Sequence, residues 1–154
     1  MRLTGFSDYT LRVLIYLGLN PDRLITIDEI ATAYDISRNH LMKIVHHQAK
    51  RGTIVTVRGK GGGMRLGLTP EQINVGRLVR ETEQNMALVE CFNPARSGCC
   101  KIESVCVLRG ALNRATEAFY DVLEQYCLAD LIAPQRQLCQ LLGIDDPNVV
   151  VCER

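Results

Sequence analysis

Three stretches in the first fifty residues repeat apolar positions at helical spacing, and each begins at a residue that commonly caps a helix. The side chain of such a cap accepts a hydrogen bond from a free backbone N–H of the first turn. Thr26 and Glu29 have the spacing of a capping box, in which the glutamate returns a second bond. The pattern predicts helices over residues 8–19, 27–34 and 38–50, capped by Ser7, Thr26 and Ser37.

The second and third predicted helices meet at a turn of about three residues around Asp35. Two short helices joined so tightly form a helix-turn-helix, whose second helix enters the DNA major groove. The alternative is a helix hairpin with a polar outer face. The third helix favours DNA, because its outward positions carry donors and cations that read base edges. Its candidate base-reading residues are Arg38, Asn39, His40 and Lys43.

A glycine-rich stretch separates the β-branched residues 54–57 from the residues 64–68. This pattern predicts two strands joined by a flexible, basic tip, and a hairpin directly after a recognition helix is a wing. Candidate phosphate-binding cations are Arg58, Lys60 and Arg65. A nucleotide-binding loop is the alternative, but no Lys-Ser or Lys-Thr follows and no G-x-G-x-x-G opens a helix.

Two further helices are predicted in the second half. One starts at Thr69 or Asn74, and the other extends from Ser104 to Tyr126 with apolar residues at intervals of three and four, which makes about six turns. The single apolar stripe of so long a helix favours pairing with a second copy of the chain over burial within one chain.

The predicted fold is therefore mainly α with a small β wing. It divides into a winged helix-turn-helix DNA-binding domain, a cysteine loop, a dimerisation helix with a C-terminal helix, and a tail, over residues 1–82, 83–106, 104–142 and 143–154.

Composition and charge support this interpretation. With 154 residues, 47% hydrophobic and 23% charged, the chain suits one folded domain with a dimerisation arm and is not intrinsically disordered. Apolar runs fall short of the ~18 residues of a membrane helix, so we expect a soluble, cytoplasmic protein without a membrane partner.

The net charge of +1 combines +5 over residues 1–70 (ten Lys or Arg, five Asp or Glu) with −4 over 71–154 (eight Lys or Arg, twelve Asp or Glu). Residues 37–65 alone carry +7 with no acid, which favours a polyanion partner over a solvated basic face.

All seven cysteines lie in the second half, and Cys91, Cys99, Cys100 and Cys106 fall within sixteen residues. In a reducing cytosol this indicates metal ligation or redox chemistry rather than disulfides. Iron-sulfur is preferred over zinc, because the C-x2-C and C-x4-C pairs of structural zinc sites are absent. A thiol switch remains the alternative, since Cys99 adjoins Cys100. No C-x-x-C motif is present, so neither an enzyme nor a catalytic residue is expected.

The surroundings of Cys106 and of the three later cysteines can also be predicted. Cys106 is expected in the first turn of the long helix, where the helix dipole and the charges of Lys101 and Arg109 favour a thiolate. Cys127 and Cys139 are interpreted as buried small apolar residues, and Cys152 as a tail thiol.

From Leu3 to about Leu142 the chain resembles the Rrf family of winged-helix regulators, and in particular its nitric-oxide-sensing iron-sulfur repressors. The resemblance is carried by the start of the first helix, the recognition helix, the wing, the cysteine spacing and a short C-terminal motif, at residues 7–12, 36–44, 57–67, 88–106 and 128–131. The biogenesis regulator of that family has a histidine where this chain has Arg109, which argues against that relative.

The resemblance implies a homodimer on a pseudo-palindromic operator in double-stranded DNA, with an iron-sulfur cluster of 4Fe-4S type preferred over 2Fe-2S. Its implied ligands are Cys91, Cys100 and Cys106, with Cys99 as the alternative to Cys100 because this loop is longer than in other members. The implied fourth ligand is Asp8 from the partner subunit; on the residues alone, Asp8 is a first-turn acid paired with Arg12.

Nitric oxide would attack the iron and release repression of detoxification genes. The alternative function is an iron-sulfur or redox-responsive regulator of cluster biogenesis or of iron or cysteine metabolism, which uses the same cysteines as a zinc or thiol switch.

Overall fold

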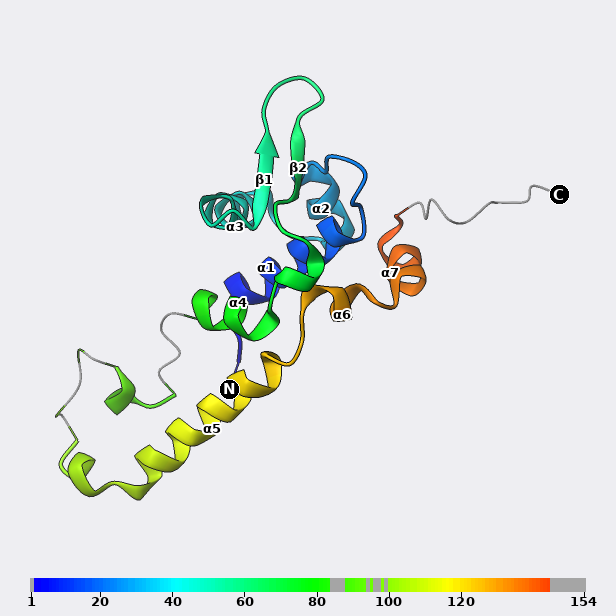
Figure 1. Cartoon of the computed structure of the whole chain (residues 1–154). Coiled ribbons are helices and arrows are strands. Elements are labelled where there is room, and N and C mark those ends of the chain that lie inside the picture. Colours follow the sequence, from blue (N-terminus) through cyan, green and yellow to red (C-terminus); the bar gives the residue numbers. More distant parts are fainter. Residues whose placement is uncertain (1, 84–87, 94, 96–97, 99, 145–154) are drawn as a thin grey trace.

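The computed structural model describes residues 2–83, 88–93, 95, 98 and 100–144 (Figure 1). It is mainly helical, with one two-stranded antiparallel sheet, and so confirms the predicted fold class. The elements in chain order are α1 (Gly5–Gly18), α2 (Ile27–Tyr34), α3 (Arg38–Lys50), β1 (Ile54–Val57), β2 (Gly63–Leu66), the 3-10 turn η1 (Pro70–Gln72), α4 (Val75–Thr82), the 3-10 turns η2 (Glu90–Phe92) and η4 (Glu103–Val105), α5 (Val107–Leu123), α6 (Leu128–Ile132) and α7 (Gln135–Leu142).

Helix α1 begins one turn earlier than predicted. Thr4 is its N-cap, and the Thr4 hydroxyl accepts a hydrogen bond from the Ser7 backbone N–H at 3.3 Å. The prediction of Ser7 as the cap was wrong. Ser7 is 1% exposed inside the first turn, and its hydroxyl donates to Thr82 of α4 at 2.7 Å. Two hydroxyl residues three positions apart can both cap a helix, and here the second one packs between helices.

Helices α2 and α3 follow the predicted bounds. The capping box of Thr26 and Glu29 is present in both directions, and Ser37 caps α3 through the His40 backbone N–H. Asp35 ends α2 in the left-handed conformation at φ 52°, with its N–H bonded to the Ala31 carbonyl. This single residue gives the sharp reversal that a helix-turn-helix needs.

The predicted wing is also present. Strands β1 and β2 pair with Val55 opposite Arg65, but the second strand spans Gly63–Leu66 rather than residues 64–68. The Gly67 N–H still continues the register by bonding the Thr53 carbonyl at 2.8 Å, but the Thr53 N–H bonds the Gln48 carbonyl and returns no bond to the second strand. A Cβ at Gly67 would lie 2.2 Å from a backbone oxygen, so glycine is required at this close approach.

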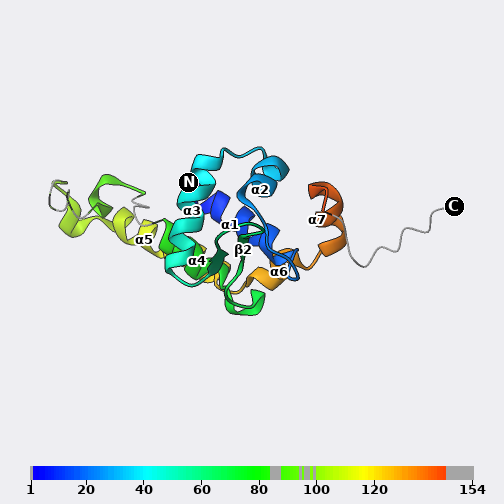
Figure 2. The same ribbon diagram turned by 90° about the horizontal axis from the view of Figure 1, so that it is seen from above.

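The main core joins both ends of the chain. Its buried members come from α1, α2, α3, the hairpin and α4, together with Leu128, Cys139 and Ile144 from the C-terminal region. Helix α6 packs directly on α1, where the Ile132 side chain lies beside Gly18. Seen from above, α5 and α7 extend to opposite sides of the winged-helix body (Figure 2). The C-terminal helices thus complete the core that carries the recognition helix.

Helix α5 is shorter than predicted, with 17 residues or about five turns. It ends at Leu123 because the Tyr126 carbonyl accepts a hydrogen bond from the Val75 N–H at 3.0 Å, which draws the chain toward α4. Cys106 is the N-cap residue of α5 and not part of its first turn, which corrects that expectation. Among the described residues, no helix has both the length and the apolar character that crossing a bilayer requires.

Candidate functional site

The recognition helix presents a polar face opposite its buried one. Leu41, Ile44, Val45 and Gln48 are buried against the rest of the domain. The opposite side is therefore directed to solvent, and all four predicted base-reading residues are exposed: Arg38, Asn39, His40 and Lys43.

An ion pair orients the first of these residues. The Arg38 Nε lies 2.9 Å from Asp28 Oδ1 of α2, and both side chains are more than half exposed. An exposed pair of this kind contributes at most about 1 kcal/mol. The guanidinium is thus held at the start of α3 while its release to a DNA phosphate or base costs little.

Helix α1 supports one flank of α3 through two ring contacts. Tyr9 lies beside His40 with ring centroids 6.1 Å apart, and Phe6 meets His47 edge-on at 5.3 Å. Both histidines therefore face α1 with one side of their rings. The first turn of α1 is in this way mechanically linked to the DNA-facing helix.

Asp8, the implied fourth ligand, is paired within its own chain. Its Oδ2 lies 2.9 Å from Arg12 Nη2, and its Oδ1 accepts from Arg12 Nε at 3.2 Å. The Arg12 guanidinium also lies 5.7 Å from the ring centroid of Tyr34. Burial raises the pKa of Tyr34 to about 12, although the charge of Arg12 opposes that shift.

The wing carries the predicted cations on its surface. Arg58, Lys60 and Arg65 are all exposed on the hairpin or its connecting loop, which projects from the body of the molecule (Figure 1). Gly59 and Gly61 in that loop have φ values of 103° and 77°, a region that favours glycine. The loop therefore turns tightly and keeps its cations at the tip.

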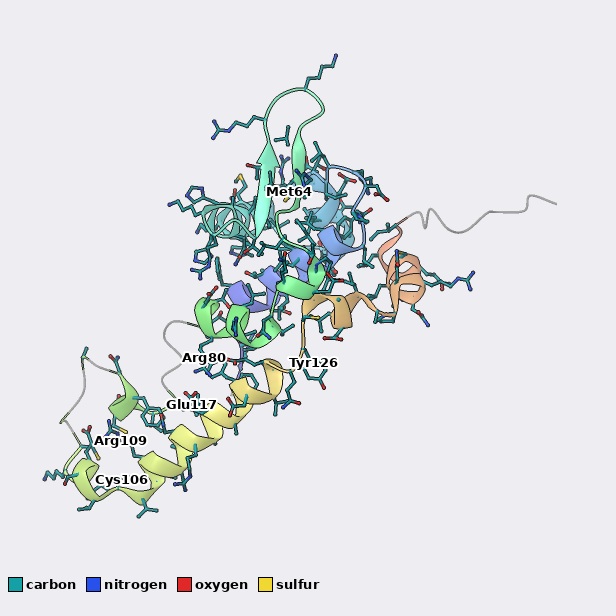
Figure 3. All side chains as sticks on the ribbon, in the orientation of Figure 1. Met64, Arg80, Cys106, Arg109, Glu117 and Tyr126 are labelled. Atoms are coloured by element: carbon teal, nitrogen blue, oxygen red, sulfur yellow. The ribbon has the colours of Figure 1, made fainter. Side chains whose placement is uncertain are left out.

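The cysteine segment lies away from the recognition helix. Cys91 is half-buried in η2, Cys100 is exposed, and Cys106 is half-buried at the start of α5, which lies far from the hairpin residue Met64 (Figure 3). All three are free thiols. Cys99 lies outside the described residues. Within the described part of the chain, no three His, Cys, Asp or Glu side chains gather closely enough to hold a metal ion, so the ligand set stays a prediction.

The donor chemistry of this segment nevertheless fits an iron-sulfur cluster, which is held by cysteine thiolates. Glu103 organises the segment, because its carboxylate accepts from the Gly98 N–H at 2.7 Å and pairs with Arg109 at 3.4 Å. Because the Glu103 carboxylate pairs with Arg109, it partly offsets the positive charge that Arg109 was expected to add beside Cys106 (Figure 3).

Two other cysteines have structural surroundings. Cys139 is 1% exposed in the main core, which confirms that prediction. Cys127 is only half-buried, so its prediction was wrong. Its backbone N–H and its thiol both donate to the Asp130 carboxylate, at 2.7 and 3.2 Å. These bonds lower the pKa of Asp130. Cys152 lies outside the described residues.

Helix α4 connects the DNA-binding body to both α1 and α5. Glu83 accepts two hydrogen bonds from Thr4, while Arg80 lies 4.1 Å from the Tyr120 ring centroid and pairs with Glu117 (Figure 3). Sequence reasoning missed these residues. Their partners are 37 to 79 positions apart, and no local pattern indicates such contacts.

A winged helix-turn-helix with a polar recognition helix and a basic wing defines the class of DNA-binding regulators. The sequence comparison agrees with this class. Residues 3–134 match the Rrf2 family, described as "Iron-dependent Transcriptional regulator", and the chain belongs to that family.

Relatives extend over nearly the whole chain. The HTH-type transcriptional regulator NsrR of Bacillus licheniformis is 46% identical over 93% of this chain and 100% of its own length. NsrR of Bacillus subtilis is also 46% identical, over 95% of this chain and 100% of its own length.

Solved structures show the same fold. Staphylococcus aureus CymR in its oxidized form has a TM-score of 0.67 and 26% identity, and the match covers 85% of this chain and 95% of that one. IscR of T. potens has a TM-score of 0.69 at 21% identity, over 87% and 88% of the two chains, which concerns the fold alone. The chain is a transcriptional repressor of the type of its NsrR relatives and not an enzyme, and the alternative regulatory function is not favoured.

Proposed function

We propose that the chain forms a cytoplasmic homodimer that represses transcription and senses nitric oxide through an iron-sulfur cluster. The observation that carries the proposal is the 46% identity to NsrR over the full length of that relative. The free thiols of Cys91, Cys100 and Cys106 in one segment support it, because cluster iron prefers such ligands. Genes for the detoxification of nitric oxide are the proposed targets.

The proposed dimer pairs the α5 helices of two copies. Leu108 and Val122 of α5 are 62% and 54% exposed in the single chain, and Tyr126 just beyond the helix is 47% exposed. Phe119 packs toward α4, so the apolar stripe is only partly covered within one chain. Burying this stripe against its twin gains about 25 cal/mol for each Å² of apolar surface removed from water. A two-fold dimer presents two copies of α3, which suits a pseudo-palindromic operator.

The proposed DNA contacts follow from the exposed residues. Arg38, Asn39, His40 and Lys43 of α3 face the base edges, while Arg58, Lys60 and Arg65 contact phosphates or the flanking minor groove. Because Asp28 holds Arg38 by an exposed ion pair only, the arginine is free to exchange this carboxylate for DNA.

In the proposed cluster site, Cys91, Cys106 and Cys100 or its neighbour Cys99 supply three ligands, and Asp8 of the partner subunit supplies the fourth. A 4Fe-4S cluster is preferred over 2Fe-2S. When bound, the cluster supplies iron to which nitric oxide binds, and an oxygen ligand leaves that iron more accessible than a fourth thiolate would.

The residues of this chain provide a route from that site to DNA. Asp8 lies next to Tyr9, and Tyr9 contacts His40 of the recognition helix. Asp8 as a ligand would give up its ion pair with Arg12, which also contacts Tyr9 and Tyr34. A change at Asp8 is thus expected to alter the support of α3.

The test compares Cys91→Ala, Cys100→Ala and Cys106→Ala with Cys127→Ser, a control that keeps a hydrogen-bonding side chain beside Asp130. Each protein is purified without oxygen, and its iron, sulfide and operator binding are measured. The three alanine variants should lose iron and specific binding together, and the control should keep both. Tight, specific operator binding by an iron-free alanine variant would overturn the proposal.

A further inference from the structure

Met42 is a large apolar side chain on the polar face of the recognition helix. It is 49% exposed in the middle of α3, although its nearest neighbours along that face are polar or charged. Single exposed apolar residues are ordinary on protein surfaces and need no explanation there. The position of Met42, within the helix that the fold directs to the major groove, is what gives it significance.

Helical geometry places Met42 in one row with Arg38 and His46, four residues before and after it. Asn39 and Lys43 form the adjacent row, and all four of these neighbours are exposed. Met42 therefore shares its surface with Arg38, Asn39 and Lys43, three of the four residues proposed to read bases.

The other flank of α3 is already occupied. His40 and His47 face α1 through Tyr9 and Phe6, as the ring contacts show. Met42 lies on the opposite flank, because positions 40 and 47 are separated from it by about 160° and 140° around the helix at 100° for each residue. Contacts with α1 thus do not cover Met42. Its flank is the one where Arg38 pairs with Asp28 of α2, and Met42 remains 49% exposed there.

The chemistry of the major groove offers one group that suits such a residue. Arginine, asparagine and lysine contact the donors and acceptors of guanine and adenine, but thymine is also marked by its C5 methyl group, which apolar side chains contact. Methionine is flexible and polarizable, so it adapts to a methyl group at the edge of a base pair.

We propose that Met42 contacts the C5 methyl group of a thymine in each operator half-site and is thereby a specificity-determining residue. The inference rests on the DNA binding of the proposed function, and it does not depend on the type of cluster. In each such contact, about one methyl group of the DNA and one of the protein are buried. This burial predicts a four- to tenfold preference for thymine over uracil at that position.

The test first selects bound sequences from a random duplex DNA pool with the wild-type protein, purified without oxygen. The selected duplex is then synthesised with deoxyuridine in place of each half-site thymine in turn, which removes only the methyl group. For the wild type, one such replacement should weaken binding four- to tenfold. Met42→Ala should bind the unmodified duplex more weakly by a similar factor and should not respond to that replacement.

Two further variants separate specificity from general affinity. Met42→Leu should restore most of the preference for the methyl group, while Lys43→Ala should weaken binding but keep the response to deoxyuridine. A Met42→Ala protein with an undiminished response would overturn the inference, as would a wild type that responds at no thymine. If the wild type selects no sequence at all, the DNA binding of the proposed function fails, and the inference fails with it.

Discussion

The carboxylate of Glu83, at the end of α4, accepts two hydrogen bonds from Thr4, the N-cap of α1. The Thr4 backbone N–H lies 2.6 Å and its hydroxyl 2.9 Å from Glu83 Oε1, and Glu83 is 6% exposed. A negative charge at this place also complements the dipole of α1. The first turn of α1 is therefore fastened to α4, which leads to the cysteine segment, while the same turn contacts α3.

Replacement of Glu83 by alanine should lower the free energy of unfolding by about 2 to 3 kcal/mol, because Thr4 loses a charged acceptor in a mostly buried place. Urea titrations at equal iron content measure the change. Asp121→Ala, at an exposed position of α5, is the control and should shift stability by less than about 0.5 kcal/mol. An equal shift for both variants would contradict the fastening role of Glu83.

Gly76 allows α4 to approach the end of α5. A Cβ at this position would lie 2.5 Å from the Glu124 backbone nitrogen and 2.8 Å from its Cα. We expect Gly76→Ala to cost about 1 to 3 kcal/mol through overpacking. Gly110→Ala, in α5, meets nothing within 4 Å and should be neutral or stabilising by up to about 1 kcal/mol. Equal denaturation midpoints for the two variants would show that the helices separate without cost.

Stability should fall at alkaline pH because of the half-buried Tyr34. The folded pKa of Tyr34, about 12, lies above the ordinary value near 10, so the folded state holds a proton that the unfolded state releases. After solvent screening at this half-buried ring, the stabilisation is about 2 kcal/mol; it is complete below pH 10 and is lost as pH rises through 12. Denaturation between pH 9 and 12 should show a smaller loss for Tyr34→Phe, and an unchanged slope would refute the assignment.

The wing cations should contribute to affinity without reading sequence. Arg58→Ala and Lys60→Ala are each expected to lower the slope of log affinity against log salt by about one. The loss should be similar on specific and random duplexes. Arg136→Ala, on the distant α7, should leave the slope unchanged (Figure 2). A selective loss on the operator alone would assign the wing to base recognition instead.

Local signals predicted the elements that carry their own caps. Thr26 with Glu29 and Ser37 fixed the starts of α2 and α3, because a capping side chain bonds N–H groups only two or three residues ahead. The ends of α1 and α5 depended on distant partners. Ser7 is buried because its hydroxyl donates to Thr82, and Tyr126 lies outside α5, where its carbonyl accepts from the Val75 N–H. The local sequence reveals neither contact.

The candidate site also has a part that local sequence predicts and a part that it does not. Helical periodicity alone indicated that Arg38, Asn39, His40 and Lys43 are exposed, because burial of one face leaves the opposite face outside. The cysteines differ, since three ligands on a loop meet only when the loop folds around what they bind. Their spacing predicted soft ligands but no geometry, and in the described residues these thiols do not form a ready-made group.

The central claim is that nitric oxide ends DNA binding through the iron held by this chain. The most direct measurement follows operator binding by anisotropy while nitric oxide is added stepwise to anaerobic, iron-loaded protein, with the visible absorption of the cluster recorded in the same sample. We expect release from the operator to parallel the loss of that absorption, and Cys106→Ala to show neither signal. An operator complex that persists after the absorption has changed completely would contradict it.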